Sequence, residues 1–187
     1  MTKARERLGQ LIQERALLRG NIKLASGKMS SYYIDGKMIL VSGESSTLIG
    51  EVLYEMTRDL KLDAIGGPEV GAIPMATAAV IRYQQAARPL EGFFVRKDVK
   101  THGTQKQIEG KFQSGYRVAL VEDVITTAGS LLQAAVAVEM AGGKIEVVIC
   151  LVDRLQGGRQ NVEARGLRFE HVFTIEDLGV KLDPSAA

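Results

Sequence analysis

The chain alternates short apolar runs with longer segments whose apolar residues recur at helical spacing, and this alternation restricts its fold more than any other feature. The expected elements, in chain order, are a helix at 44–60, a strand at 64–66, a helix at 72–85, strands at 92–95 and 118–121, a helix at 129–141 and a strand at 145–152. This order predicts an α/β fold with a mostly parallel central sheet flanked by helices. At 187 residues, one domain over 1–187 is expected.

The first 40 residues follow a different pattern. Five apolar residues recur at helical spacing, namely Leu8, Leu11, Ile12, Leu17 and Leu18. With Gly20 as a stop signal, they predict an N-terminal helix of about four turns. Residues 22–40 then combine Ser, Gly and aromatic residues with partial alternation, which predicts short strands around the Ser26–Gly27 turn. We therefore expect an N-terminal helix and an irregular β flap over 1–40, followed by an α/β core over 41–178.

Charge and composition argue against several classes of function. Lys and Arg total 24 against 22 Asp and Glu, a net charge of +2, so no basic excess points to nucleic acid or to an anionic membrane. The longest apolar runs fall far short of the roughly 20 residues of a membrane-spanning helix, and residues 2–7 contain no apolar signal core. The single cysteine, Cys150, lies in an apolar run, which predicts a buried thiol without a chemical role. A cytoplasmic protein is expected.

Residues 118–130, VALVEDVITTAGS, carry the strongest chemical signal. Glu122 and Asp123 follow an apolar strand at its carboxyl end, where ligands bind in open α/β sheets. Adjacent carboxylates repel each other, and a positive or hydroxyl-rich group that binds them, such as a ribose diol, offsets this repulsion. Residues 126–130 then place small side chains and backbone N–H groups where the next helix begins, which suits a phosphate. The segment predicts a site for 5-phosphorylated ribose; a plain turn with a capping threonine is the alternative.

A polar segment without helical or strand periodicity, KDVKTHGTQKQIEGKF, covers residues 97–112. A connection this long is usually functional or disordered, so we expect a flexible catalytic loop. Its start carries Arg96, Lys97, Lys100 and His102, whose positive charges can neutralise a departing group that accumulates negative charge. A proton donor such as His102 or Lys100 would add about 10²–10⁴-fold. A solvated basic surface loop is the alternative.

These segments together resemble a known family. Residues 118–130 look like the phosphoribosyl-pyrophosphate signature of type I phosphoribosyltransferases, and residues 96–103, RKDVKTHG, resemble the RKxxKxHG loop of the orotate phosphoribosyltransferases. The resemblance implies a type I phosphoribosyltransferase fold with an N-terminal hood. It also implies transfer of ribose 5-phosphate to orotate, giving orotidine 5′-monophosphate and diphosphate in pyrimidine biosynthesis. Mg2+, bound mainly through the phosphoribosyl pyrophosphate, and a homodimer that shares the loop between subunits are implied as well.

The resemblance also assigns residue roles. Catalysis falls to Lys100 and His102. Binding of phosphoribosyl pyrophosphate falls to Arg96, Lys97, Lys100, His102, Glu122, Asp123, Val124, Ile125, Thr126, Thr127, Ala128, Gly129 and Ser130. Orotate falls to Thr126 and to Arg154, which lies in VDRLQGGR at residues 152–159 and matches the DRxxGG pattern of the family. A guanidinium grips a carboxylate bidentately, and a purine has no carboxylate. A salt bridge with Asp153 or a nearby carboxylate is the alternative for Arg154.

The family's flap, SGxxSxYxxD, matches residues 26–35. Tyr32 and Tyr33 would either stack on the pyrimidine or pack in the core, and the sequence leaves both open. Two departures concern lysines that some orotate enzymes carry, because Ala25 and Val70 stand in those regions here. Cationic contacts are not expected from these two positions.

Two rival functions remain open at this point. A purine phosphoribosyltransferase would share residues 118–130 but would not need Arg154 or the RKxxKxH loop. A non-catalytic regulator that binds phosphoribosyl pyrophosphate and a nucleic acid would need a large basic surface or an added segment. His171, in the apolar-alternating FEHVF, is expected to be structural, and residues after Leu178 to form a loosely held tail.

Overall fold

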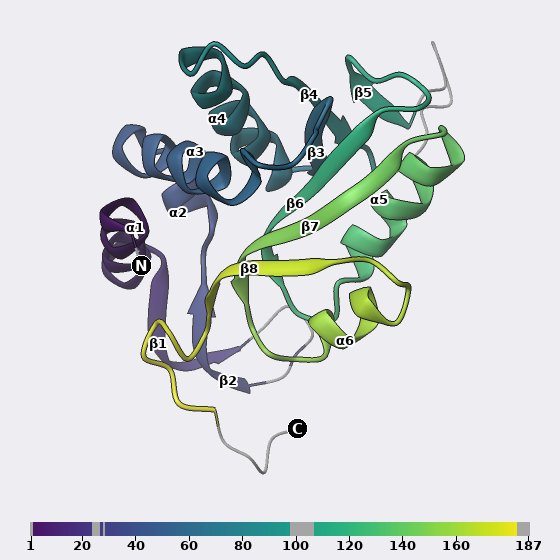
Figure 1. Cartoon of the computed structure of the whole chain (residues 1–187). Coiled ribbons are helices and arrows are strands. Elements are labelled where there is room, and N and C mark those ends of the chain that lie inside the picture. The colour runs from purple at the N-terminus through teal and green to yellow at the C-terminus, as the bar shows by residue number, and fades with distance from the viewer. Residues whose placement is uncertain (1, 24–26, 28, 98–106, 183–187) are drawn as a thin grey trace.

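A computed structural model of the chain describes residues 2–23, 27, 29–97 and 107–182. Six of its strands form the central sheet in the order β5-β4-β3-β6-β7-β8 (Figure 1). Five of them run parallel: β3 (Ala64–Pro68), β4 (Glu91–Val95), β6 (Arg117–Ile125), β7 (Lys144–Asp153) and β8 (Phe169–Thr174). The short β5 (Ile108–Gly110) pairs antiparallel with β4. The predicted α/β fold with a mostly parallel sheet is confirmed.

Helices cover both faces of this sheet because its central strands are apolar on both sides. The first face packs against α1 (Lys3–Arg15), α3 (Gly43–Thr57) and α4 (Ala72–Gln85), and the second against α5 (Gly129–Met140) and α6 (Gly158–Glu163). Successive residues of a strand point to opposite faces. Ala119 and Val121 accordingly join the first core, whereas Val118 and Leu120 join the second. None of the helices in the described ranges is both long and apolar enough to cross a membrane.

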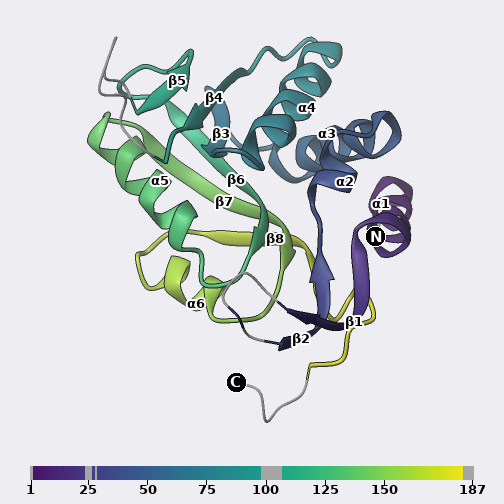
Figure 2. The ribbon, with the colours of Figure 1, turned by 180° about the vertical axis from the view of Figure 1, so that it is seen from behind.

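An antiparallel hairpin of β1 (Leu17–Lys23) and β2 (Met29–Ile34) precedes the core and lies beside the lower ends of β6 and β7 in both Figure 1 and Figure 2. The expected hairpin is confirmed, although its Ser26 turn lies outside the described residues. The short α2 (Lys37–Leu40) follows it. The expected reach of the N-terminal helix through Leu18 is wrong, because Leu17 is buried and Leu18 exposed, the alternation of a strand.

Three other boundaries differ from the sequence expectation. The strand expected to end at Val121 continues through Ile125, because its last residues pair with β7. The expected loop 97–112 contains β5, which pairs with β4, while residues 98–106 lie outside the described ranges. The tail after Leu178 is not loose at Val180, which is buried, and Gly179 accepts a hydrogen bond from Arg19. In each case a long-range contact orders residues whose local sequence is uninformative.

Candidate functional site

Four parallel strands end at one edge of the sheet, and each is followed by a polar turn. The strands β3, β4, β6 and β7 end at Pro68, Val95, Ile125 and Asp153, with Pro68 beside Val95 and Ile125 beside Asp153. The residues that follow these ends are Glu69, Arg96, Thr126 and Arg154. The fold therefore gathers the predicted ribose-phosphate segment, the start of the polar loop and Arg154 at the edge where α/β proteins bind ligands.

The turn between β6 and α5 is shaped to receive an anion. Ala128 has φ 64° and ψ 21°, a left-handed conformation that costs a non-glycine residue about 1–2 kcal/mol. No side chain caps the first turn of α5, so the alternative of a capping threonine is not what the structure shows. Thr127, Gly129 and Ser130 are exposed. Uncapped N–H groups at a helix N-terminus attract negative charge, as a phosphate would supply.

Helix α6, which follows β7, contacts the turn between β6 and α5. Asn161 of α6 donates a hydrogen bond from Nδ2 to the Thr127 carbonyl at 3.0 Å. Gly158 lies so close that a Cβ there would be 2.7 Å from the Thr126 carbonyl oxygen. Neither α6 nor a role for Asn161 was predicted from the sequence. The double glycine of VDRLQGGR was the available signal, because it permits such a close approach.

Glu122 and Asp123 both lie at the end of β6 and are only partly exposed. Burial, with the neighbouring charge of Asp123, raises the pKa of Glu122 to about 9. Burial also raises the pKa of Asp123, and the hydrogen bond from the Val124 N–H, 2.9 Å from Oδ1, opposes this rise. The positive charge of Lys37 opposes it further. Burial therefore favours the protonated forms of the pair, whereas hydroxyl donors or a cation bound there would favour the ionised forms.

Two glycines that the sequence reasoning missed enclose the Asp123 carboxylate. A Cβ on Gly71 would lie 2.5 Å from Oδ1, and a Cβ on Gly36 would overlap Oδ2. Gly36 follows β2 and Gly71 precedes α4, so two separate loops approach one side chain. Neither position needs glycine for its φ angle, since both lie in the right-handed helical region. Only the contact with Asp123 explains them.

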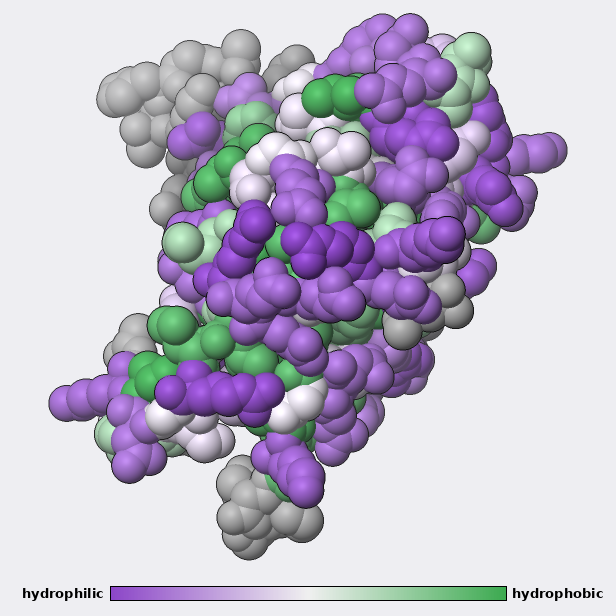
Figure 3. Space-filling view, turned by 90° about the vertical axis from the view of Figure 1, so that its left-hand side faces the viewer, coloured by the Kyte–Doolittle hydropathy of each residue, from purple (hydrophilic) through white to green (hydrophobic). Residues whose placement is uncertain are grey.

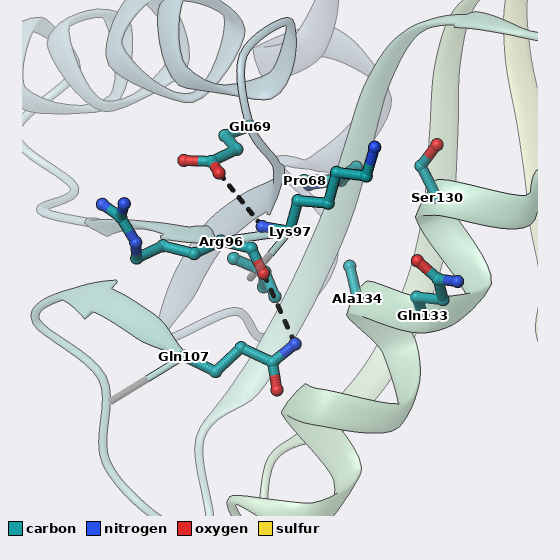
Figure 4. A pocket seen from close by; sticks show the side chains of 9 residues that line it. Pro68, Glu69, Arg96, Lys97, Gln107, Ser130, Gln133 and Ala134 are labelled. Carbon is teal, nitrogen blue, oxygen red and sulfur yellow. Dashed lines mark hydrogen bonds between the residues drawn. The ribbon is translucent and has the colours of Figure 1, made fainter. Parts of the chain in front are cut away.

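A cavity of about 280 Å³ lies between the end of β4 and the start of α5. It is lined by Pro68, Glu69, Val95, Arg96, Lys97, Gln107, Ser130, Gln133 and Ala134. Glu69 Oε1 accepts a hydrogen bond from the Lys97 backbone N–H at 3.0 Å, and Gln107 Nε2 donates to the Arg96 carbonyl at 3.4 Å. In Figure 4 the Lys97 side chain points towards the side of Ser130, whereas Arg96 points away from α5. The structure thus brings Lys97, but not the Arg96 guanidinium, towards the phosphate turn.

Lys100 and His102, the expected catalytic residues, lie outside the described residues, as do Ala25 and Ser26. Their roles stay predictions. Val70, where some family members carry lysine, lies within the described residues and is 70% exposed. It precedes Gly71, whose backbone contacts Asp123. Within the described ranges, no group of three or more His, Cys, Asp or Glu side chains is arranged to hold a metal ion.

Arg154 occupies a fixed position at the end of β7. Its backbone N–H donates to the Ile125 carbonyl at 3.0 Å, and its side-chain Nε donates to the Tyr32 hydroxyl at 3.1 Å. The expected alternative, an ion pair with a carboxylate, is not found for Arg154 in the described part of the chain. The neighbouring Asp153 is buried and instead accepts a hydrogen bond from the Leu155 N–H. Arg154 is therefore available to an external carboxylate.

The two flap tyrosines differ in how far their side chains are exposed. Tyr32 is 4% exposed and packs with the core, whereas Tyr33 is 37% exposed. His171 also lies apart from the site: it belongs to the edge strand β8, where it pairs in register with Cys150 of β7, and its Nδ1 accepts from Arg159 Nη2 at 3.0 Å. Burial lowers the pKa of His171. This environment fits the structural role expected for it.

These features define the fold and site of a type I phosphoribosyltransferase. They are a mostly parallel sheet, an acidic pair near the end of β6, a turn into α5 that suits an anion, and a hairpin beside them. Comparison with known proteins narrows this class. An orotate phosphoribosyltransferase of Aquifex aeolicus is 40% identical over 177 residues, which cover 93% of this chain and 97% of that protein. No family model matches the chain. The chain belongs to the orotate phosphoribosyltransferase family.

Solved structures agree with this assignment. Orotate phosphoribosyltransferase of Mycobacterium tuberculosis, in complex with Fe(III) dicitrate, aligns with a TM-score of 0.85 at 38% identity, covering 95% of this chain and 99% of that one. A structure of the same enzyme in complex with 5-phospho-alpha-D-ribosyl 1-diphosphate aligns with a TM-score of 0.81 at 36% identity, with the same coverage. The activity is accordingly that of a pentosyltransferase, EC 2.4.2.10, in pyrimidine biosynthesis.

Proposed function

We propose that the site described above binds phosphoribosyl pyrophosphate and orotate and transfers ribose 5-phosphate to N1 of orotate, releasing diphosphate. The observation that carries this proposal is the position of Arg154, free of any carboxylate among the described residues, at the same sheet edge as the acidic pair and the phosphate turn. A base that bears a carboxylate fits such an arginine, and a purine does not. The Mycobacterium tuberculosis complex supports phosphoribosyl pyrophosphate as the other substrate.

In this proposal the ribose 5-phosphate is held from two sides. Residues Thr126 to Ser130 bind the 5-phosphate through backbone N–H groups and hydroxyls. Glu122 and Asp123 accept hydrogen bonds from the ribose hydroxyls, which favours their ionised forms and lowers the raised pKa values. The sugar is thereby fixed with its anomeric carbon towards the base, so that transfer needs little further ordering.

The donor set at this site fits Mg2+ held mainly by the substrate. Magnesium prefers oxygen ligands, and one or two protein carboxylates commonly complete a shell supplied by substrate phosphates. Glu122 and Asp123 offer such oxygens, while no cluster of three metal-ligating side chains exists in the described ranges. When bound, the metal would supply positive charge to the leaving diphosphate. Glu122 and Asp123 would orient the ribose.

The site must also stabilise the negative charge of the departing diphosphate. As the bond to the anomeric carbon breaks, the ribose becomes oxocarbenium-like and the diphosphate gains negative charge. We assign its stabilisation to Arg96, Lys97, Lys100 and His102, with Lys100 or His102 as proton donor. Lys97, which already points towards the phosphate turn, supports this assignment. Closure of the loop that begins at Lys97 and precedes β5 would exclude water from the site and limit hydrolysis.

A homodimer that shares this loop belongs to the same proposal. Large apolar side chains remain exposed on the hairpin and around α2, at Leu18, Met29, Tyr33, Met38 and Val41, and a group of such side chains can mark a protein interface. On the face seen in Figure 3, hydrophilic residues cover most of the surface, and apolar residues show in both halves, including a group in the lower half at the level of the hairpin. The cytoplasmic location and the division into hood, core and loop stay predictions.

The test is the loss of orotate absorbance in the presence of phosphoribosyl pyrophosphate and Mg2+, run beside Lys100→Ala. Wild-type protein should consume orotate, and the variant should be slower by about 10²-fold or more, because the diphosphate loses a neutralising charge. Adenine, hypoxanthine and xanthine serve as competing bases. Consumption of one of these with orotate untouched would instead establish a purine enzyme.

A further inference from the structure

Tyr32 and Arg154 are 122 positions apart in the sequence and touch in the structure. The Arg154 Nε–H donates to the Tyr32 hydroxyl oxygen at 3.1 Å, and the guanidinium carbon lies 4.9 Å from the centroid of the Tyr32 ring. An arginine placed over an aromatic ring gains cation–π attraction in addition to the hydrogen bond. Tyr32 therefore contacts the side chain that is proposed to bind the carboxylate of the base.

Tyr32 itself is held firmly. Ser30 Oγ donates to the Tyr32 carbonyl at 2.7 Å and accepts from the Tyr32 N–H at 3.3 Å. Across the hairpin, Tyr32 pairs with Arg19, whose guanidinium donates to the carbonyls of Leu178 and Gly179 at 3.1 and 2.9 Å. The hairpin is thus tied to the C-terminal segment on one side, while Tyr32 reaches Arg154 on the other.

The contact with Tyr32 also determines which N–H groups of Arg154 can bind a carboxylate. Its Nε donor is engaged by Tyr32, and the described residues provide no hydrogen-bond partner for its two terminal nitrogens. A guanidinium can grip a carboxylate with two parallel N–H groups. With Nε engaged, only the pair of terminal nitrogens remains for this purpose, so Arg154 presents one defined edge. An arginine carries about 2 kcal/mol of rotamer entropy, and fixing the side chain beforehand reduces what binding must still order.

We propose that Tyr32 is a positioning residue for Arg154, which sets the affinity of the site for the carboxylate of the base. Tyr32 contacts the guanidinium through both its ring and its hydroxyl, and it acts on the substrate only through Arg154. This inference rests on the proposed function of Arg154. It separates Tyr32 from the exposed Tyr33 and gives the buried flap tyrosine a role other than stacking on the pyrimidine.

The test is Tyr32→Phe, which keeps the ring and removes the hydroxyl. We expect KM for orotate to rise about 3- to 10-fold, the effect of one hydrogen bond, with KM for phosphoribosyl pyrophosphate and kcat within about twofold. Tyr83→Phe is the matched control, because Tyr83 is also 4% exposed and its hydroxyl shares one side-chain hydrogen bond, with Thr57 at 2.8 Å. That variant should leave both KM values unchanged.

Calorimetry separates positioning from folding. Titration with orotidine 5′-monophosphate should show weaker binding to Tyr32→Phe than to wild type, while ribose 5-phosphate, which lacks the base, should bind both equally. A KM for orotate that is unchanged in Tyr32→Phe, or that rises equally in Tyr83→Phe, overturns the inference. Arg154→Ala separates the proposed role of Arg154 from that of Tyr32. If Arg154→Ala raises KM for orotate and Tyr32→Phe does not, only the proposed role of Tyr32 fails. If Arg154→Ala leaves orotate binding unchanged, both proposals fail.

Discussion

The carboxylate of Asp123 lies directly against the backbone of Gly71, where a Cβ would come within 2.5 Å of Oδ1. The two residues belong to different parts of the fold, since Asp123 lies in β6, two residues before its end, and Gly71 precedes α4. Gly36 closes the other side of the same carboxylate. The Asp123 carboxylate is therefore oriented by the close approach of two loops and by the absence of side chains on Gly36 and Gly71.

Gly71→Ala should displace the Asp123 carboxylate and reduce kcat/KM for phosphoribosyl pyrophosphate by about 10²-fold, the effect of a misplacement of roughly 1 Å. Stability should change little, because the end of a side chain can move more easily than backbone. Kinetics and thermal unfolding measure the two effects. Gly43→Ala is the control, because a Cβ at Gly43 meets nothing within 4 Å. Equal activity in the two variants would contradict the proposed packing.

The raised pKa of Glu122 makes stability depend on pH. Its folded pKa of about 9 exceeds the ordinary value of 4.5, so the folded state binds the proton more tightly. The stabilisation is complete below about pH 4.5 and is lost as the pH rises through about 9. Urea unfolding of the unliganded protein between pH 6 and 9 should therefore show falling stability, by at most about 1.4 kcal/mol per pH unit for one proton.

Glu122→Gln should reduce this slope, because glutamine stays neutral in both states. Glu146→Gln should leave it unchanged, since the hydrogen bond with Arg117 lowers the pKa of Glu146, which is ionised throughout this range. Identical slopes for wild type and Glu122→Gln would show that Glu122 does not hold a proton in the unliganded site.

The shared loop is tested with hybrid dimers. Lys100→Ala and Arg154→Ala homodimers are each expected to retain little activity at low orotate concentration. If the loop of one subunit completes the site of the other, mixing equal amounts should restore about a quarter of the wild-type activity, because half of the dimers are hybrids with one intact site. Hybrids without activity would rule out a shared site.

Cys150 provides a probe of global stability. It is fully buried in the middle of β7, and burial raises the pKa of its thiol, so the reactive thiolate is suppressed. As the only cysteine of the chain, it should react with a thiol reagent only when the protein unfolds, and the rate should rise with urea in parallel with the unfolded fraction. Complete labelling within seconds in native buffer would contradict its burial.

The sequence could suggest a site at residues 118–130 because its signal is local: a strand, two carboxylates and a turn into a helix lie within thirteen positions. It did not show that β6 continues through the acidic pair, because this depends on pairing with β7. The end of α1 was misplaced for a similar reason. Leu17 and Leu18 match helical spacing, but their pairing with Ile34 and Tyr33 places them in a strand.

The residues that contact Arg154 and Asp123 are not predictable from the local sequence. Tyr32 and Tyr33 are chemically identical neighbours, and only the position of the hairpin on the core decides which one meets Arg154. Gly36 and Gly71 touch Asp123 across 87 and 52 positions of sequence (123 minus 36 and 123 minus 71). No local pattern encodes such an approach. Their neighbours gave partial hints, since Gly36 follows the flap pattern and Gly71 follows the departure at Val70.

The most direct test of the central claim is chromatographic identification of the products formed from orotate, phosphoribosyl pyrophosphate and Mg2+. The structure predicts orotidine 5′-monophosphate and diphosphate in equal amounts, with no nucleotide formed when adenine, hypoxanthine or xanthine replaces orotate. A purine nucleotide, or orotate recovered unchanged with active, folded protein, would contradict the assignment of Arg154 and of the site around it.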